Sequence, residues 1–125
     1  MKKLLLSLPI LFVAHNAFAT EACDKFTTSY DRTYCTAKLF VESDNELNQV
    51  YKELKTHLKG DISKALTATQ RNWIKYRDNQ CENDGNIAVD CNFQVNKTRT
   101  EYLRDRLREC KTGNCQPDLI RSESW

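Results

Sequence analysis

The sequence predicts a small all-α protein, a helical hairpin or three-helix bundle held by disulfides and preceded by a cleaved signal peptide. Three observations support this prediction. A short apolar run follows two lysines at the N-terminus, and six cysteines come after that run. Through the rest of the chain, apolar residues recur at helical spacing and no segment alternates as a strand would.

The first nineteen residues have the organisation of a secretory signal peptide. Two lysines precede the apolar run, and Ala17 and Ala19 put small residues where a signal peptidase reads, so cleavage is expected between Ala19 and Thr20. The run is too short for a membrane anchor. A lipoprotein is the nearer alternative because Cys23 follows, but the three residues before it fit a lipidation site badly. We expect a periplasmic or secreted protein without stable membrane insertion.

The composition limits what the exported chain can do. The formal charge of +2 comes from the two lysines of the signal peptide, so the mature chain carries equal numbers of acidic and basic residues. This balance gives no support to nucleic-acid binding. We expect a signal peptide over residues 1–19, one helical domain over residues 20–109, and a cysteine-closed loop with a flexible tail over residues 110–125.

An even number of cysteines in an exported chain indicates a disulfide framework. The sequence leaves fifteen pairings open. Proximity favours pairing each cysteine with its neighbour in the chain. The alternative is a zinc site, which the wide spacings and the lack of a Cys-x-x-Cys motif disfavour. The cysteines are Cys23, Cys35, Cys81, Cys91, Cys110 and Cys115.

Three helices are expected. The first begins near Ser29 or Thr33 and ends near Lys59, because Phe40, Leu47, Tyr51, Leu54 and Leu58 form one apolar stripe. Gly60 ends it. The second spans about 62–80 and the third about 93–109. Ile87 and Val89 stand alone in the segment between these two helices, which is therefore expected to be a loop.

Charged residues interrupt the apolar stripes of the first two helices. Asp44 follows Phe40 by four residues, and Arg77 follows Trp73 by four. With a tight turn at Gly60, antiparallel helices would place Asp44 opposite Arg77 inside the hairpin. Pairing resolves the cost of burying either charge alone. Arg99 on the third helix is expected near the same height, where it would share Asp44. We interpret the three as a structural ion pair rather than a catalytic group.

The same residues carry a family resemblance. The pattern Asp44-x-x-Leu-Asn-x-x-Tyr51, followed by Gln70-Arg-x-Trp-Ile-x-Tyr-Arg-Asp-x-x-Cys81, resembles the LprI-like domain family, which is named for a lipoprotein that inhibits lysozyme. The resemblance covers roughly Cys23 to Leu107 and implies a small, exported, helical domain with paired cysteines. It implies lysozyme as a partner, and it leaves Cys110 and Cys115 as an addition to the usual pattern.

The sequence favours binding over catalysis. It contains no Gly-x-Ser-x-Gly, His-Glu-x-x-His or phosphate-binding glycine loop. Paired cysteines would leave no thiol nucleophile, and no cofactor or metal is implied. We therefore expect a protein that is not an enzyme. The alternatives to lysozyme inhibition are a cell-envelope interaction or stress-protection module with another partner, and, third, a cell-wall hydrolase.

An acidic loop is the candidate binding element. The stretch from Asp78 to Asn96 contains no lysine or arginine, and Glu82, Asp84 and Asp90 lie in it. The following segment, 97–111, is rich in basic residues. The Cys81–Cys91 disulfide would close the acidic loop and lower the entropy cost of binding. Animal-type lysozymes are cationic, so electrostatic attraction would favour their encounter with this loop. The simpler interpretation is a solvated connection between two helices.

Overall fold

The fold is a small α-helical bundle with three disulfides, as the sequence predicts. The computed structural model describes residues 18–125, and for residues 18–20 the backbone alone. Most of the expected signal peptide lies outside the described residues. Within them, no helix is both long enough and apolar enough to cross a membrane. The elements are α1 (Phe18–Cys23), α2 (Ser29–Thr56), α3 (Gly60–Cys81), β1 (Glu82–Asn83), β2 (Asn86–Ile87), α4 (Val89–Lys111) and α5 (Pro117–Arg121).

Local signals set the ends of the long helices. Thr28 caps α2: its Oγ1 accepts a hydrogen bond from the Asp31 backbone N–H at 3.0 Å. Gly60, at φ +57°, lets the chain reverse between α2 and α3. The Cys23–Cys35 disulfide ties the short α1 to the second turn of α2. Helices α2 and α3 therefore run antiparallel, as expected.

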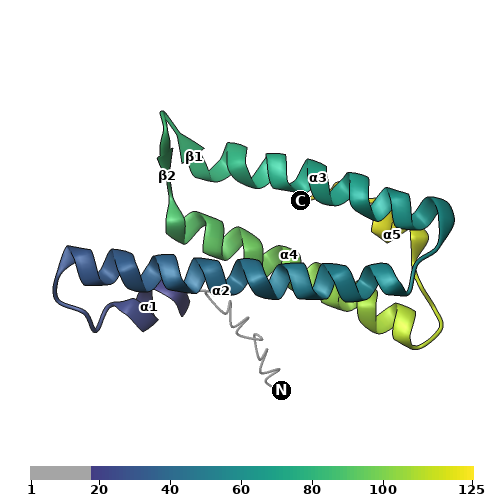
Figure 1. Cartoon of the computed structure of the whole chain (residues 1–125), viewed down its shortest axis with the longest axis horizontal. Helices are drawn as coiled ribbons and strands as arrows, with labels where there is room; N and C mark the ends of the chain where they lie inside the picture. The colour runs from purple at the N-terminus through teal and green to yellow at the C-terminus, as the bar shows by residue number, and fades with distance from the viewer. Residues whose placement is uncertain (1–17) are drawn as a thin grey trace, which may run out of the picture.

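The closest helix pair is not the one that the sequence suggested. Figure 1 shows α4 lying along α2 in the same direction, while α3 runs antiparallel to both. The backbones of α2 and α3 stay farther apart because bulky side chains, Trp73 above all, fill the space between them. The bundle is therefore a parallel α2–α4 pair with α3 laid across a layer of large side chains.

The core forms where four helices meet. Leu54 and Leu103 are buried, and Trp73 is 2% exposed. The predicted apolar stripe of α2 supplies much of this core from Leu47 onward, whereas Phe40 is only partly buried. The core residues are Leu47, Val50, Leu54, Leu58, Leu66, Trp73, Leu103, Leu107, Cys110 and Ile120.

A polar layer joins all three long helices beside this core. Nη1 of Arg77 lies 3.1 Å from Oδ1 of Asp44 and 3.2 Å from Oδ1 of Asn96. Nδ2 of Asn96 donates in turn to the hydroxyl of Ser43 at 3.1 Å. Asn96 is completely buried, but the Asp44 side chain is 42% exposed. The pair thus lies at the edge of the interior, with Asn96 beneath it, rather than deep inside the hairpin.

Arg99 does not share Asp44, contrary to the sequence-based expectation. Because α4 runs parallel to α2, Asn96 is the α4 residue that lies level with Asp44. Arg99 is about one turn further along α4 and reaches α3 instead, where its Nε donates to Oε1 of Gln70 at 3.0 Å. The predicted three-residue cluster is therefore an Asp44–Arg77 pair with Arg99 in a separate environment.

The C-terminal segment also differs from the flexible tail that was expected. The Cys110–Cys115 disulfide closes the loop after α4, and Pro117 begins α5. Ile120 is 2% exposed in the core, and its carbonyl accepts a hydrogen bond from the Thr69 hydroxyl at 3.3 Å. Trp125 packs against Tyr76, with ring centroids 6.0 Å apart. Burial of Ile120 and packing of the partly buried Trp125 hold this segment against α3.

We predict that Arg77→Ala lowers the free energy of unfolding by about 2–3 kcal/mol. The substitution leaves the buried side-chain carbonyl of Asn96 without its hydrogen-bond donor and removes the partner of Asp44. Asp44→Asn should cost less than about 1 kcal/mol, since that carboxylate is well hydrated. Urea denaturation of both variants measures the difference. If both variants lose the same free energy of unfolding, Arg77 stabilises the protein through its ion pair with Asp44 and not through its hydrogen bond to Asn96.

Replacing Ile120 by alanine should lower the free energy of unfolding by about 2–4 kcal/mol, because it leaves a cavity in the core. The matched control is Leu119→Ala, which removes the same number of carbons from a side chain that is 40% exposed. The control should cost less than about 1 kcal/mol. If the two variants unfold at the same urea concentration, the C-terminal segment does not contribute to the core.

Candidate functional site

The segment between α3 and α4 is a β-hairpin that projects from one end of the bundle (Figure 1). Glu82 pairs with Ile87, and Asn83 pairs with Asn86. Asp84 and Gly85 form the turn, with φ angles of +49° and +77°. Two consecutive positive φ angles are typical of the tight turn that Asp-Gly sequences favour. A loop was expected at this segment, and the Asp84-Gly85 pair is the sequence signal that indicates a hairpin instead.

A disulfide closes the base of this hairpin. Cys81, the last residue of α3, is bonded to Cys91 in the first turn of α4, with Cα atoms 5.4 Å apart. Just inside it, the Ala88 backbone N–H donates to the Cys81 carbonyl at 2.8 Å. Both ends of the hairpin are therefore anchored to long helices, which limits how far its tip can move.

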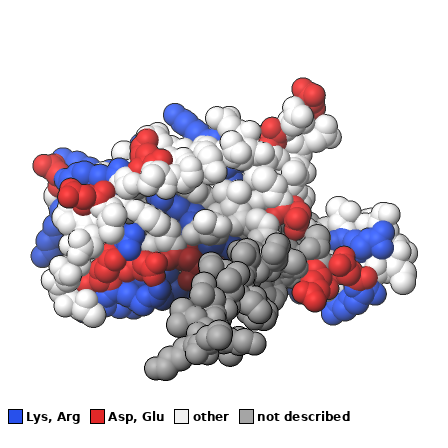
Figure 2. Space-filling view, turned by 180° about the vertical axis from the view of Figure 1, so that it is seen from behind, with Lys and Arg blue, Asp and Glu red and all other residues white. Residues whose placement is uncertain are grey.

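Three carboxylates give the hairpin and its base a negative charge. Glu82, Asp84 and Asp90 are all exposed. Within residues 18–125, none of the three lies within 4.0 Å of a lysine, arginine or histidine nitrogen. Figure 2 shows acidic residues on the projecting hairpin, at the upper right of that view. The hairpin also exposes an apolar side chain, Ile87, which is 59% exposed. We call residues 82–90 the acidic hairpin.

The basic residues of α4, in contrast, are mostly paired. Lys97 and Arg104 both contact Glu46 of α2, and these hydrogen bonds, that from Arg104 most of all, hold the pKa of Glu46 below its usual value. Lys111 reaches Glu53 at 2.6 Å. Further along α4, Arg106 pairs with Glu109 and Arg108 pairs with Asp105. Acidic and basic groups therefore neutralise each other along α4, whereas the carboxylates of the acidic hairpin stay unpaired.

The described residues offer little that could support metal or thiol chemistry. All six cysteines are in disulfides. Among residues 18–125, no three histidine, cysteine or acidic side chains are grouped so that they could hold a metal ion. His57 is exposed at the C-terminal end of α2. The acidic hairpin instead presents a projecting, negatively charged surface.

The comparison with known protein families agrees with the motif resemblance. No curated protein and no solved structure matches the chain. The model of the family described as "Lysozyme inhibitor LprI" matches residues 20–103, which run from α1 through the acidic hairpin and well into α4. The match covers most of the chain and ends before the Cys110–Cys115 loop. The chain therefore belongs to the LprI lysozyme inhibitor family.

Proposed function

We propose that this protein inhibits lysozyme by binding it and occluding its substrate cleft with the acidic hairpin. The family to which the chain belongs is described as a lysozyme inhibitor family, which supports lysozyme as the partner. The observation that carries the choice of surface is the set of three unpaired carboxylates on a projection that a disulfide closes. Inhibition by occlusion needs no catalytic residue in the inhibitor.

Charge supports this assignment. Animal-type lysozymes carry a net positive charge, so an unpaired acidic projection would increase the rate of encounter and favour approach with the hairpin first. Most basic residues of α4 are paired with carboxylates, so they add little long-range repulsion toward a cationic partner. The acidic hairpin therefore presents a group of unpaired negative charges to such a partner.

Shape and stiffness support it as well. Enzyme substrate sites are concave, and a narrow projection can enter such a site where a flat helical face cannot. The Cys81–Cys91 disulfide and the tight turn at Asp84 and Gly85 restrict the hairpin before it binds. Less conformational entropy is then lost in the complex.

A stable complex needs more contact area than the tip of a two-stranded hairpin can provide. The surface next to it extends the candidate interface. A shallow groove joins Ile87 and Val89 to Asp24, which follows α1, and to Arg32 and Thr33 near the start of α2. We propose that the hairpin enters the lysozyme cleft while this groove meets the cleft rim.

We further propose that the protein acts in the periplasm or outside the cell, after removal of residues 1–19. Three disulfides support an oxidising compartment. N-terminal sequencing of the exported protein tests this proposal. A mature N-terminus at Thr20 is the expected result, and recovery of a chain that still begins at Met1 would contradict it.

An envelope interaction with a different partner remains the second candidate. One observation favours it: Tyr30, Tyr34 and Val41 are exposed along the first half of α2, at 78%, 66% and 55%. An exposed apolar strip of this kind can mark a contact surface. Binding to a cell-envelope component that is lost on substitution of this strip, together with absence of lysozyme inhibition by the unmodified protein, would favour this candidate.

The direct test neutralises the acidic hairpin. The triple variant Glu82→Gln, Asp84→Asn, Asp90→Asn should lose at least about tenfold in inhibitory potency in a lysozyme turnover assay, because steering and charge complementarity are removed. The loss should shrink as salt is added, since salt screens exposed charges.

The matched control removes the same charges elsewhere. Glu42→Gln, Asp61→Asn and Asp118→Asn change one glutamate and two aspartates that are all exposed and lie outside the acidic hairpin. This control should keep its potency within about twofold. Equal potency of the two triple variants would exclude the acidic hairpin, and absence of inhibition by the unmodified protein would exclude the proposed function.

Opening the base of the hairpin tests the role of stiffness. Cys81→Ser with Cys91→Ser should weaken inhibition and also lower stability by about 3 kcal/mol, the loop-entropy value for a short disulfide loop. Cys110→Ser with Cys115→Ser removes a disulfide at the other end of α4 and should lower stability comparably while leaving inhibition unchanged. If both double variants weaken inhibition equally, general destabilisation accounts for the effect.

A further inference from the structure

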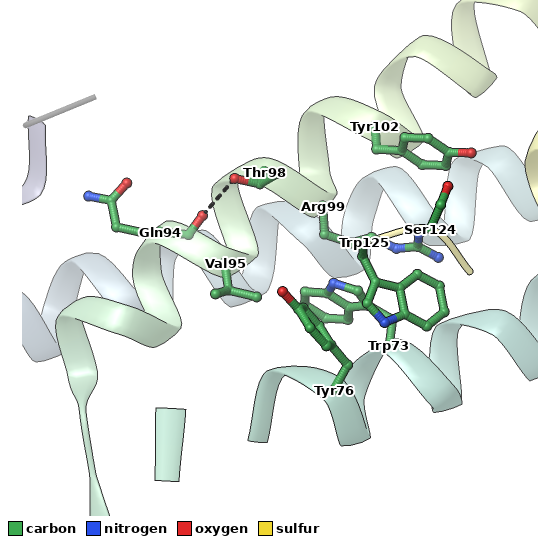
Figure 3. Close-up of a pocket in the computed structure, with 9 residues that line it drawn as sticks. All are labelled: Trp73, Tyr76, Gln94, Val95, Thr98, Arg99, Tyr102, Ser124 and Trp125. Carbon is green, nitrogen blue, oxygen red and sulfur yellow. Dashed lines mark hydrogen bonds between the residues drawn. The ribbon is translucent and has the colours of Figure 1, made fainter. Parts of the chain in front are cut away.

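A second concave feature lies away from the acidic hairpin, between α3, α4 and the C-terminal segment. It is a cavity of about 230 Å³. Figure 3 shows its aromatic walls, with Tyr76 and Trp125 packed together on one side and Tyr102 across from them. The exposed residues Thr98 and Ser124 lie on its lining, so the cavity opens to solvent there.

Arg99 supplies the only basic group on this lining. The residue is 5% exposed, and its guanidinium lies 5.3–5.8 Å from the ring centroids of Trp73, Tyr102 and Trp125. Figure 3 shows the guanidinium end between Tyr102 and Trp125. Burial lowers the pKa of Arg99 to about 10, so the side chain stays charged at neutral pH. A cation is therefore held among aromatic rings at the cavity wall.

The guanidinium has donors that the protein does not use. Within residues 18–125, its one hydrogen bond is from Nε to Gln70, and no carboxylate lies within 4.0 Å of it. Glu123 acts on it only from a distance and accepts a hydrogen bond from Asn72. Among the described residues, every fully buried polar side-chain atom has a hydrogen-bond partner. The two Nη atoms have none, so they must be accessible to solvent.

These observations define the chemistry of a ligand. Two free Nη groups on one planar fork match the two oxygens of a carboxylate. Aromatic walls favour a flat apolar body beside it. A cavity of about 150 Å³ accepts benzene, so this one has room for a benzene ring with a carboxylate attached. A phosphate monoester fits less well, because the lining offers one cation and few other donors.

We propose that this cavity binds a small aromatic carboxylate, with the carboxylate on the Nη groups of Arg99 and the ring between Tyr76, Tyr102 and Trp125. Binding supplies the buried cation with the counter-charge that the protein itself does not provide. The site is separate from the acidic hairpin and does not depend on lysozyme as a partner.

The test uses benzoate and the mature protein alone. Trp73 and Trp125 are the two tryptophans of the chain, and both line the cavity, so intrinsic fluorescence reports occupancy directly. We expect a saturable change with a dissociation constant of about 1 mM or tighter. Benzamide has the same shape without the charge and should bind at least tenfold more weakly, as should acetate, which lacks the ring.

Two variants locate the site. Arg99→Lys keeps the charge but loses the planar fork, and should weaken benzoate binding at least tenfold. Thr98→Phe fills the mouth from an exposed position, and should abolish binding without lowering the melting temperature. Thr56→Phe, an exposed position at the end of α2, is the matched control and should bind like the unmodified protein.

Three results would overturn the proposal. They are no saturable fluorescence change with benzoate, equal binding of benzoate and benzamide, and unchanged benzoate binding by the Thr98→Phe variant. The last would place the ligand elsewhere on the protein. None of these measurements contains lysozyme, so failure here leaves the proposed inhibition to be judged by its own assay.

Discussion

The packing of Trp73 against two arginines is the interaction on which the arrangement of the long helices depends. The guanidinium groups of Arg77 and Arg99 lie 5.5 Å and 5.8 Å from its ring centroid. A ring of this size between α3 and the α2–α4 pair keeps α3 at a distance, and each of the two cations beside it needs polar partners of its own. Arg77 finds Asp44 and Asn96, whereas Arg99 finds only Gln70 and aromatic faces. The bundle therefore contains one completed polar contact and one incomplete one.

The disulfides lie at the ends of the bundle and leave its centre to side-chain packing. One ties α1 to α2, one closes the acidic hairpin and one closes the turn after α4. Each spans a short stretch of chain, so each restricts a local loop more than it restricts the unfolded chain as a whole. Their main effect is to fix the connections and the projecting hairpin, while the core around Trp73 sets how the helices cross.

The sequence predicted what periodicity and charge can reveal. It located the three long helices and the level at which Asp44 meets Arg77, because both follow from spacing along one chain reversal. It did not predict that α4 lies parallel to α2, since periodicity identifies an inward face but not the helix that the face meets. Because the direction of α4 was not predicted, Arg99 was expected beside Asp44, whereas it contacts Gln70. The C-terminal segment was missed because Ile120 is a single buried residue in a short helix and makes no repeating pattern.

The two surfaces differ in their relation to the family. The acidic hairpin lies wholly within residues 20–103, the part of the chain that the family model matches. An activity common to the family can therefore depend on it. The cavity around Arg99 is completed by Ser124 and Trp125, which lie beyond the matched residues. Arg99 and Tyr102 alone would leave the guanidinium open to solvent on that side. Ligand binding there thus depends on the C-terminal segment, and the Cys110–Cys115 loop, which turns the chain back toward α3, is the feature that makes such a site possible.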